Sequence, residues 1–266
     1  MFNKQHLNIT MRNLLVHFII TFFVLLGCKD KSVEHLEEVE LPEILEPLKP
    51  LADDDLVSLS ADLEAHLITQ KIDRNDIPNG SIKYADIKNV DSLHIQFVGA
   101  NKSMRGLEYF TNLVYLKFQA YQVPTDITNN YSWAFPVGVV KEFKPPLDTL
   151  DIRYNLKLEY LDVSGHSDGG GQRASIGFLK LGANTKLKTL ISIYAMLKTM
   201  NLTGLTNLEY LNIGENYSLK EVRLCTNTKL KKLRSWQVER FYVPDPANMS
   251  PDLVRETGGA TYLKCE

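Results

Sequence analysis

A short pattern of apolar positions recurs along most of this chain. Its frame is an apolar residue, two others, an apolar residue, one other and a third apolar residue. Leu208-Leu211-Ile213 follows this frame, and it returns eleven positions further on as Leu219-Val222-Leu224. The alternation at the end of each unit is typical of a short strand with its apolar side chains on one face. A unit this small can bury that face only against the next unit, so the pattern predicts a stacked array.

The frame continues between residues 90 and 245, and its further occurrences are Val90-Leu93-Ile95, Leu113-Leu116-Phe118, Leu147-Leu150-Ile152, Leu158-Leu161-Val163, Ile176-Leu179-Leu181, Leu187-Leu190-Ser192, Leu197-Met200-Leu202, Leu230-Leu233-Ser235 and Val238-Phe241-Val243. Two alternating frames of about 11 residues make a coil of about 21–22 residues, within the range of leucine-rich repeats. Asparagine stands three positions after the last apolar residue of four units, at Asn155, Asn184, Asn216 and Asn227. There we expect the side-chain amide to bond backbone groups that the turn leaves unpaired.

The segments around the array have other patterns. In residues 53–89, the leucines at 56, 59, 63 and 67 predict an amphipathic helix up to Lys71 that caps the open end of the core. Residues 246–266 are interpreted as a C-terminal tail or cap. Within the array, the stretch from Leu113 to Leu147 is too long for one coil, and residues 165–175 are a Gly-rich insertion. The long stretch carries Tyr121, Tyr131, Trp133 and Phe135, which either bind a partner or fill a gap in the core.

The N-terminal residues 1–27 are interpreted as a signal peptide. Lys4 and Arg12 precede an apolar run from 14 to 27, which is shorter than the roughly 20 residues of a membrane-spanning helix. The run ends in Leu25-Leu26-Gly27-Cys28, which resembles a bacterial lipobox, and this predicts lipidation of Cys28. The alternatives are an ordinary secretory signal with a chance cysteine, or an internal start at Met11.

Residues 28–52 are acidic and contain prolines, which disfavour a long helix, so this segment is interpreted as a tether. With an acylated Cys28, the chain is expected to be lipid-anchored in the bacterial outer membrane. Whether it faces the surface or the periplasm stays open. Cys225 and Cys265 then remain either as a disulfide or as two free thiols. The net charge of −2 comes from 30 basic and 32 acidic residues without a basic block, which argues against a nucleic-acid partner.

Two short motifs carry a family resemblance. They are the run from Gly106 to Leu113 and the closing Phe241-Tyr242-Val243-Pro244. With the repeats, they make the chain similar to leucine-rich-repeat lipoproteins exported by Gram-negative bacteria, which have internalin-like surface proteins among their relatives. The resemblance implies an α/β-type, strand-rich solenoid of right-handed coils with a short helical N-terminal cap. It also implies a binding protein rather than an enzyme.

One loop has features of a calcium site. Asp73, Asn75, Asn79 and Asp86 place oxygen ligands around Gly80, although the spacing departs from an EF-hand loop and Asp86 replaces the usual Glu. The resemblance also implies a degenerate calcium loop here, with a structural ion. The alternative is a Pro-Asn-Gly turn with solvated acidic residues. No cofactor is otherwise expected, and His35, His66, His94 and His166 show neither ligand spacing nor a neighbouring nucleophile motif.

The outward positions of alternate frames predict a binding face. One set of frames places aromatic, amide and charged side chains there, and from these we select Tyr115, Tyr160, Asp162, Tyr210, Asn212, Arg234 and Trp236. Exposed aromatics with Arg and Asn are typical of protein and sugar binding surfaces. The sequence thus favours a protein partner on the concave face. The alternatives are glycan capture, a structural role in an outer-membrane complex, and tyrosines that only stabilise the sheet.

Overall fold

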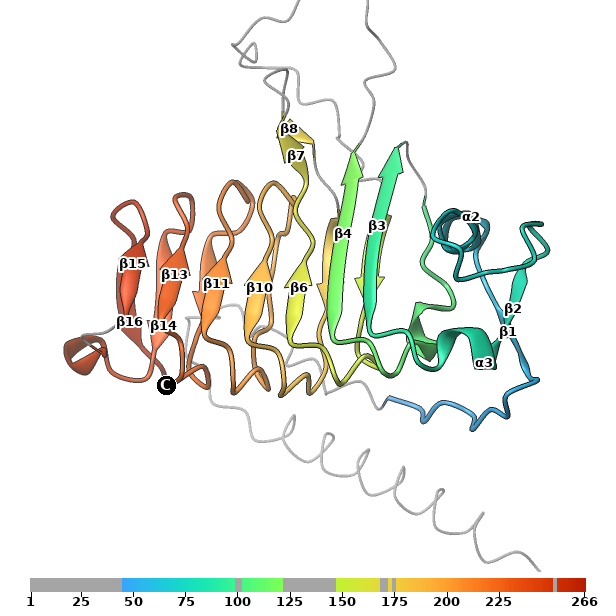
Figure 1. The fold of residues 1–266 in the computed structure, drawn as a ribbon. Helices are drawn as coiled ribbons and strands as arrows, with labels where there is room; N and C mark the ends of the chain where they lie inside the picture. The colour runs from blue at the N-terminus through green and yellow to red at the C-terminus, as the bar shows by residue number, and fades with distance from the viewer. Residues whose placement is uncertain (1–44, 99–101, 122–146, 168–171, 174–175, 251–252) are drawn as a thin grey trace, which may run out of the picture. The chain divides into compact units, whose positions relative to one another are not determined.

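The computed structural model describes residues 45–98, 102–121, 147–167, 172–173, 176–250 and 253–266 (Figure 1). The predicted signal peptide, Cys28 and most of the tether lie outside the described residues, as do Tyr131, Trp133, Phe135 and the Gly169–Gly171 run. Glu46–Glu266 form a unit of their own. In the described part of the chain, no helix is long and apolar enough to cross a membrane.

The N-terminal part of this unit combines a small antiparallel pair with two short helices. Strand β1 (Leu56–Ser58) pairs with β2 (Ser81–Lys83), and the helices are α2 (Ala61–Thr69) and α3 (Tyr84–Ile87). The expected helix is therefore shorter than the apolar pattern indicated. It begins after Ser60, whose side chain accepts a hydrogen bond from the amide of Leu63, because a serine at this position caps the first turn.

A seven-stranded parallel sheet runs through the rest of the unit. Its strands, in spatial order, are β15 (Val254–Glu256), β13 (Lys232–Arg234), β11 (Tyr210–Asn212), β10 (Thr189–Ile191), β6 (Tyr160–Asp162), β4 (Tyr115–Tyr121) and β3 (Ser92–Val98) (Figure 1). The register aligns the middle leucines of the frames in one row, namely Leu93, Leu116, Leu161, Leu190, Leu211 and Leu233. Each of these six side chains is fully buried, as the predicted frame requires.

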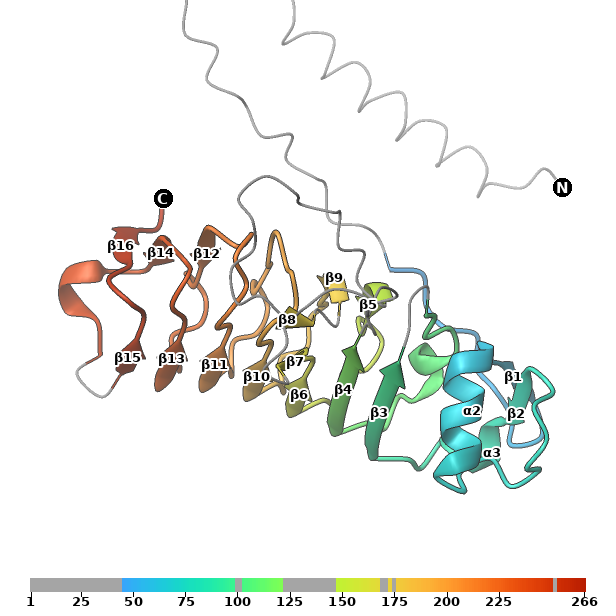
Figure 2. The same ribbon diagram turned by 90° about the horizontal axis from the view of Figure 1, so that it is seen from above.

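The alternate frames form smaller parallel sheets on the opposite side of the core (Figure 2). They are β5 (Leu147–Asp151) with β9 (Ile176–Lys180), and β12 (Glu221–Arg223) with β14 (Arg240–Val243) and β16 (Thr261–Lys264). Between these two sheets, the frame Leu197-Met200-Leu202 buries its two leucines without forming a strand. The turn before it holds Tyr194 and Met196 at φ of 56° and 52°, which extended strand geometry does not allow. Several parallel sheets around one leucine core are compatible with a leucine-rich-repeat solenoid.

The two irregular segments leave the main sheet continuous. Strand β6 pairs directly with β4, although Leu116 and Leu161 are separated by about twice the length of a coil. A short hairpin of β7 (His166–Ser167) and β8 (Gln172–Arg173) follows β6 at the second irregular segment, and β10 then pairs with β6. Each segment is therefore an insertion within a coil. It does not add a strand to the sheet, because the buried leucine row determines which strands become neighbours.

The asparagines bond the backbone of neighbouring turns, which confirms the prediction from their spacing. Asn184 Nδ2 donates to the carbonyls of Ile152 and Asn155 at 3.2 and 3.1 Å, and its Oδ1 accepts from the Gly182 amide at 2.8 Å. Asn155, Asn216 and Asn227 also donate to buried carbonyls. In the intervening turn, Leu205 occupies the equivalent position and is fully buried. These bonds satisfy turn carbonyls that no strand pairs.

The segment interpreted as a tail adds one more strand to each side. Its 3-10 turn η2 (Pro246–Asn248) leads to β15 on the main sheet and then to β16 on the opposite side. Cys265, directly after β16, forms a disulfide with Cys225 beside β12, with a Cα–Cα distance of 5.9 Å. The repeat therefore extends beyond residue 245, the predicted end of the array.

The last strand of the main sheet places a charge in the leucine row. Arg255 is in register with Leu233, yet its guanidinium lies over the Tyr262 ring at 5.3 Å and remains exposed. A charged side chain at an inward position is one way in which proteins protect a sheet edge from pairing with another chain. Arg255 therefore terminates the apolar row at the edge strand β15.

We expect the substitution Asn184→Ala to destabilise the protein by about 2–4 kcal/mol, because it leaves two buried carbonyls and one amide without partners. Urea unfolding followed by circular dichroism measures this loss. Asn201→Ala is the matched control, since Asn201 is exposed and accepts one amide hydrogen bond, from Thr203. Equal loss in both variants would contradict a stabilising role of the buried asparagines.

We further expect Arg255→Leu to promote self-association, because it continues the apolar row to the open edge of β15. Sedimentation at increasing protein concentration should show a larger average mass than for the wild type. Arg240→Leu, which adds a leucine at an exposed outward position on β14, controls for non-specific association caused by an added apolar side chain. If the two variants associate equally, Arg255 has no specific role at the edge.

Candidate binding face

The outward side chains of the main sheet form three rows across its strands, and we refer to them as the sheet face. Six of the seven residues predicted from sequence come together here, because β4, β6, β11 and β13 carry them in matched register, and Trp236 follows β13 by two residues. The sequence analysis missed one neighbour, Glu256, which lies on β15 in the segment interpreted as a tail. Ile191, which the repeat frame already places outward but which was not selected as a site residue, lies on β10 between Asp162 and Asn212.

A tyrosine pair lies on β4 and β6, near the β3 end of the sheet face. The rings of Tyr115 and Tyr160 are stacked with centroids 4.5 Å apart and an angle of 8° between their planes. Burial, followed by the nearby Asp162 carboxylate, raises the pKa of Tyr160 to about 12. The phenol is therefore protonated at neutral pH and can donate a hydrogen bond.

A paired charge cluster forms the other end. Arg234 Nε lies 2.6 Å from a carboxylate oxygen of Glu256, and Lys232 Nζ lies 3.4 Å from the other. Hydrogen bonding to Tyr210 and then to Glu256 raises the pKa of Arg234. The guanidinium carbon also lies 5.5 Å from the centre of the Trp236 ring. These contacts hold an arginine and a tryptophan in fixed positions, which lowers the entropy lost when a partner binds.

Trp236 lies against the backbone of the neighbouring strand. A Cβ atom at Gly214 would come within 2.9 Å of two carbons of the indole, so the glycine provides the space for the ring. Despite this contact, Trp236 is 47% exposed. The ring therefore presents a large apolar surface on the sheet face.

Two of the predicted residues are less accessible than their outward positions suggested. Asn212 is 5% exposed, and its side chain donates to the Tyr210 hydroxyl at 3.2 Å and accepts from the Gly214 amide at 3.3 Å. It holds Tyr210 in place and offers little surface of its own. Asp162 is 8% exposed, with one oxygen accepting from the Ser164 amide at 3.0 Å.

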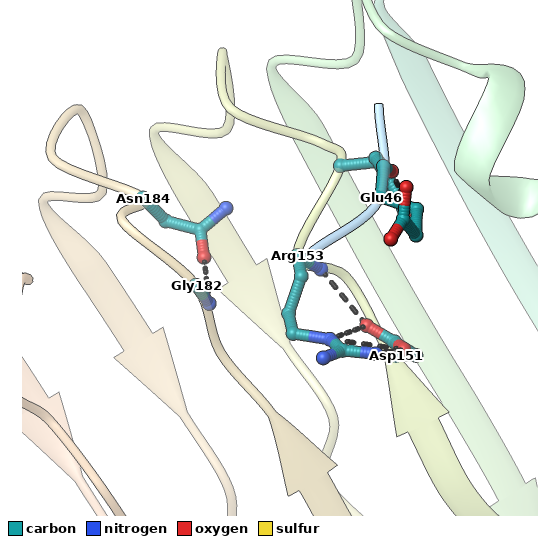
Figure 3. Close-up of polar contacts among 6 residues, drawn as sticks. Glu46, Asp151, Arg153, Gly182 and Asn184 are labelled. Carbon is teal, nitrogen blue, oxygen red and sulfur yellow. Dashed lines mark hydrogen bonds and ion pairs between the residues drawn. The ribbon is translucent and has the colours of Figure 1, made fainter. Parts of the chain in front are cut away.

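The opposite side of the core carries charges that are paired with one another. Arg153 contacts Asp151 with a shortest distance of 2.6 Å (Figure 3). The Tyr154 hydroxyl donates to the carbonyl of Glu46. Burial opposes ionisation of Asp151, but the hydrogen bonds from Arg153 leave its pKa below the usual value. Arg223 similarly lies 4.4 Å above the Tyr242 ring. An open cleft of about 560 Å³ next to β5 has lining residues of both charge signs, such as Lys102 and Asp148.

The loop predicted to bind calcium is organised by its own hydrogen bonds. Asp73 Oδ1 accepts from the Asn75 amide at 3.0 Å, and Asn79 Oδ1 accepts from the Ser81 amide at 2.9 Å. The buried carboxylate of Glu64 accepts from the amides of Asn79 and Gly80, which closes the turn. In the part of the chain that the structure describes, no three His, Cys, Asp or Glu side chains are grouped to hold a metal ion. Calcium binding with Asp86 stays a prediction.

Comparisons with known proteins add a structural likeness. The structure of an internalin (inlF) from Listeria monocytogenes is similar over 77% of this chain and 71% of that chain, at 17% identity and a TM-score of 0.30. No family model matches the chain, and no curated protein matches it. A TM-score this low supports no argument about the fold. The repeat architecture therefore rests on the register of the strands.

The fit between Gly214 and Trp236 can be tested directly. We expect Gly214→Ala to displace the indole, because the added methyl group occupies the space of two ring carbons. Trp236 fluorescence should then shift to longer wavelength as the ring becomes more solvated. The chain has 2 tryptophans, so the measurement needs a Trp133→Phe background. An unchanged spectrum would contradict the packing.

Proposed function

We propose that this chain is a non-catalytic binding module of the bacterial envelope that holds a protein partner on its sheet face. The observation that carries this proposal is the set of aromatic and arginine side chains that the strand register brings onto one regular sheet. Tyr, Trp and Arg are the residue types that contribute most to affinity at protein interfaces. Ile191 and Ile193, half-buried at the centre of the sheet face, supply an apolar middle.

The form of the site supports a large partner. The sheet face is broad and built on rigid strands, whereas small ligands are usually bound in deep pockets. We propose further that the chain is a right-handed leucine-rich-repeat solenoid, anchored in the outer membrane through a lipid on Cys28.

A glycan is the second candidate, and Trp236 is the observation that favours it. Its half-exposed ring, supported by Gly214 and next to Arg234, is a platform on which a sugar ring can stack. A structural role in an envelope complex would instead leave the sheet face without a required ligand.

The test is a capture experiment from native envelope with the chain from Glu46 onward. The parent is compared with a Tyr160→Ala, Tyr210→Ala, Trp236→Ala triple variant. A second triple variant, Phe178→Ala, Arg223→Ala, Tyr242→Ala, changes the opposite side. We expect one protein to be captured by the parent and by the opposite-side variant, and to be lost by the sheet-face variant. Circular dichroism must show that all three proteins are folded.

Loss in both variants, or in neither, would contradict binding on the sheet face. Capture of polysaccharide in place of protein, abolished by Trp236→Ala alone, would favour the glycan. Absence of any ligand that depends on either triple variant would favour the structural role.

A further inference from the structure

We propose that the sheet face recognises a lysine or arginine side chain of its partner, which binds at Asp162 beside the stacked rings of Tyr115 and Tyr160. This inference rests on the proposed function, because it specifies which partner chemistry the sheet face accepts. It is based on a carboxylate that the fold buries without a counter-ion among the described residues.

Asp162 is the buried carboxylate in question. It is 8% exposed, and the Ser164 amide donates to one of its oxygens. Among the described residues, no cationic nitrogen lies within 4.0 Å of this carboxylate. Desolvation of an ionised carboxylate is costly, and one amide hydrogen bond offsets only part of that cost. A cation from a partner would supply the missing interaction.

Two other outward carboxylates of the sheets, both less buried than Asp162, do have cationic partners. Glu256 on the sheet face holds both Lys232 and Arg234. On the opposite side, Glu221 binds Arg240 with a distance of 3.1 Å between charged atoms. These two carboxylates are thus paired locally, whereas the more deeply buried Asp162 has no ion pair among the described residues. Charge complementarity with a partner is the remaining way to pair it.

Lys117 is the cationic side chain that neighbours Asp162 on the sheet face. It is in register with Asp162 on β4, yet no ion pair joins the two side chains. Lysine is a strongly hydrated cation on a flexible stem, so it can turn to solvent while the shorter Asp162 side chain cannot. Lys117 therefore does not serve as the counter-ion of Asp162.

The tyrosines make this place suited to a cation. Tyr160 lies next to Asp162 along the strand, and its ring is stacked on Tyr115. Its phenol is neutral at physiological pH, and the raised pKa keeps it neutral well into the alkaline range. Aromatic rings attract an ammonium or guanidinium group, and the attraction is stronger where water is partly excluded. Ile191 is in register with Asp162 on the other side, so an apolar side chain and two aromatic rings flank this position. The aliphatic stem of a lysine or arginine can pack against such side chains.

The test uses three small probes with the purified protein. They are N-acetyl-lysine methylamide, N-acetyl-arginine methylamide and, as an uncharged match for lysine, N-acetyl-norleucine methylamide. Two-dimensional NMR follows the Ser164 amide and the Tyr160 ring during titration. We expect saturable shifts with the two cationic probes, weaker at high salt, and none with norleucine. Asp162→Asn should lower the affinity for the cationic probes by at least about tenfold.

The control variant is Asp148→Asn, which removes the same charge from an exposed position on β5. It should bind the probes as the wild type does. Equal response to norleucine, or unchanged affinity in Asp162→Asn, would overturn the inference. Neither result would affect the proposed function, which the capture experiment tests with Asp162 intact. Where a partner is captured, its loss in Asp162→Asn but not in Asp148→Asn would support the inference.

Discussion

The whole fold depends on the burial of one leucine row between successive coils. Each strand of the main sheet, most of them only three residues long, is too short to be stable by itself. Its central leucine is buried only because the leucines of the strands on both sides align with it. The register, the continuity of the sheet across both insertions and the outward direction of the next residues all follow from this requirement.

An array of this kind needs its ends closed, and the two ends are closed differently. At β3, helix α2 lies beside the edge strand, where His66 and Gln70 bond the carbonyl of His94. These bonds take an acceptor that another chain's strand would otherwise use. At β15, Arg255 replaces the leucine of the row, and its charge disfavours further stacking. A helix at one end and a single charge at the other thus both protect a sheet edge from pairing with another chain.

The sheet face is a consequence of this regularity. Because strands stack with unbroken register, their outward residues gather in rows, and neighbouring coils complete one another's interactions. Asn212 holds Tyr210 within one strand, whereas Gly214 makes room for Trp236 of the next coil and Glu256 binds Arg234 of the coil before it. A surface ordered in this way loses little entropy on binding, and Asp162 on it has no ion pair among the described residues.

The sequence by itself determined the buried frame, which outward residues share a face, and the role of Asn155, Asn184, Asn216 and Asn227. These features repeat with a period that local chemistry dictates. It missed the strands β15 and β16, since Arg255 breaks the apolar pattern there, and it did not indicate that Asp162 and Asn212 are buried. Only the tertiary structure decided these points, together with the pairing of Arg234 with Glu256 and the position of Trp236 against Gly214. The reason is that each depends on which side chain a neighbouring coil places opposite, and periodicity along one strand does not contain that information.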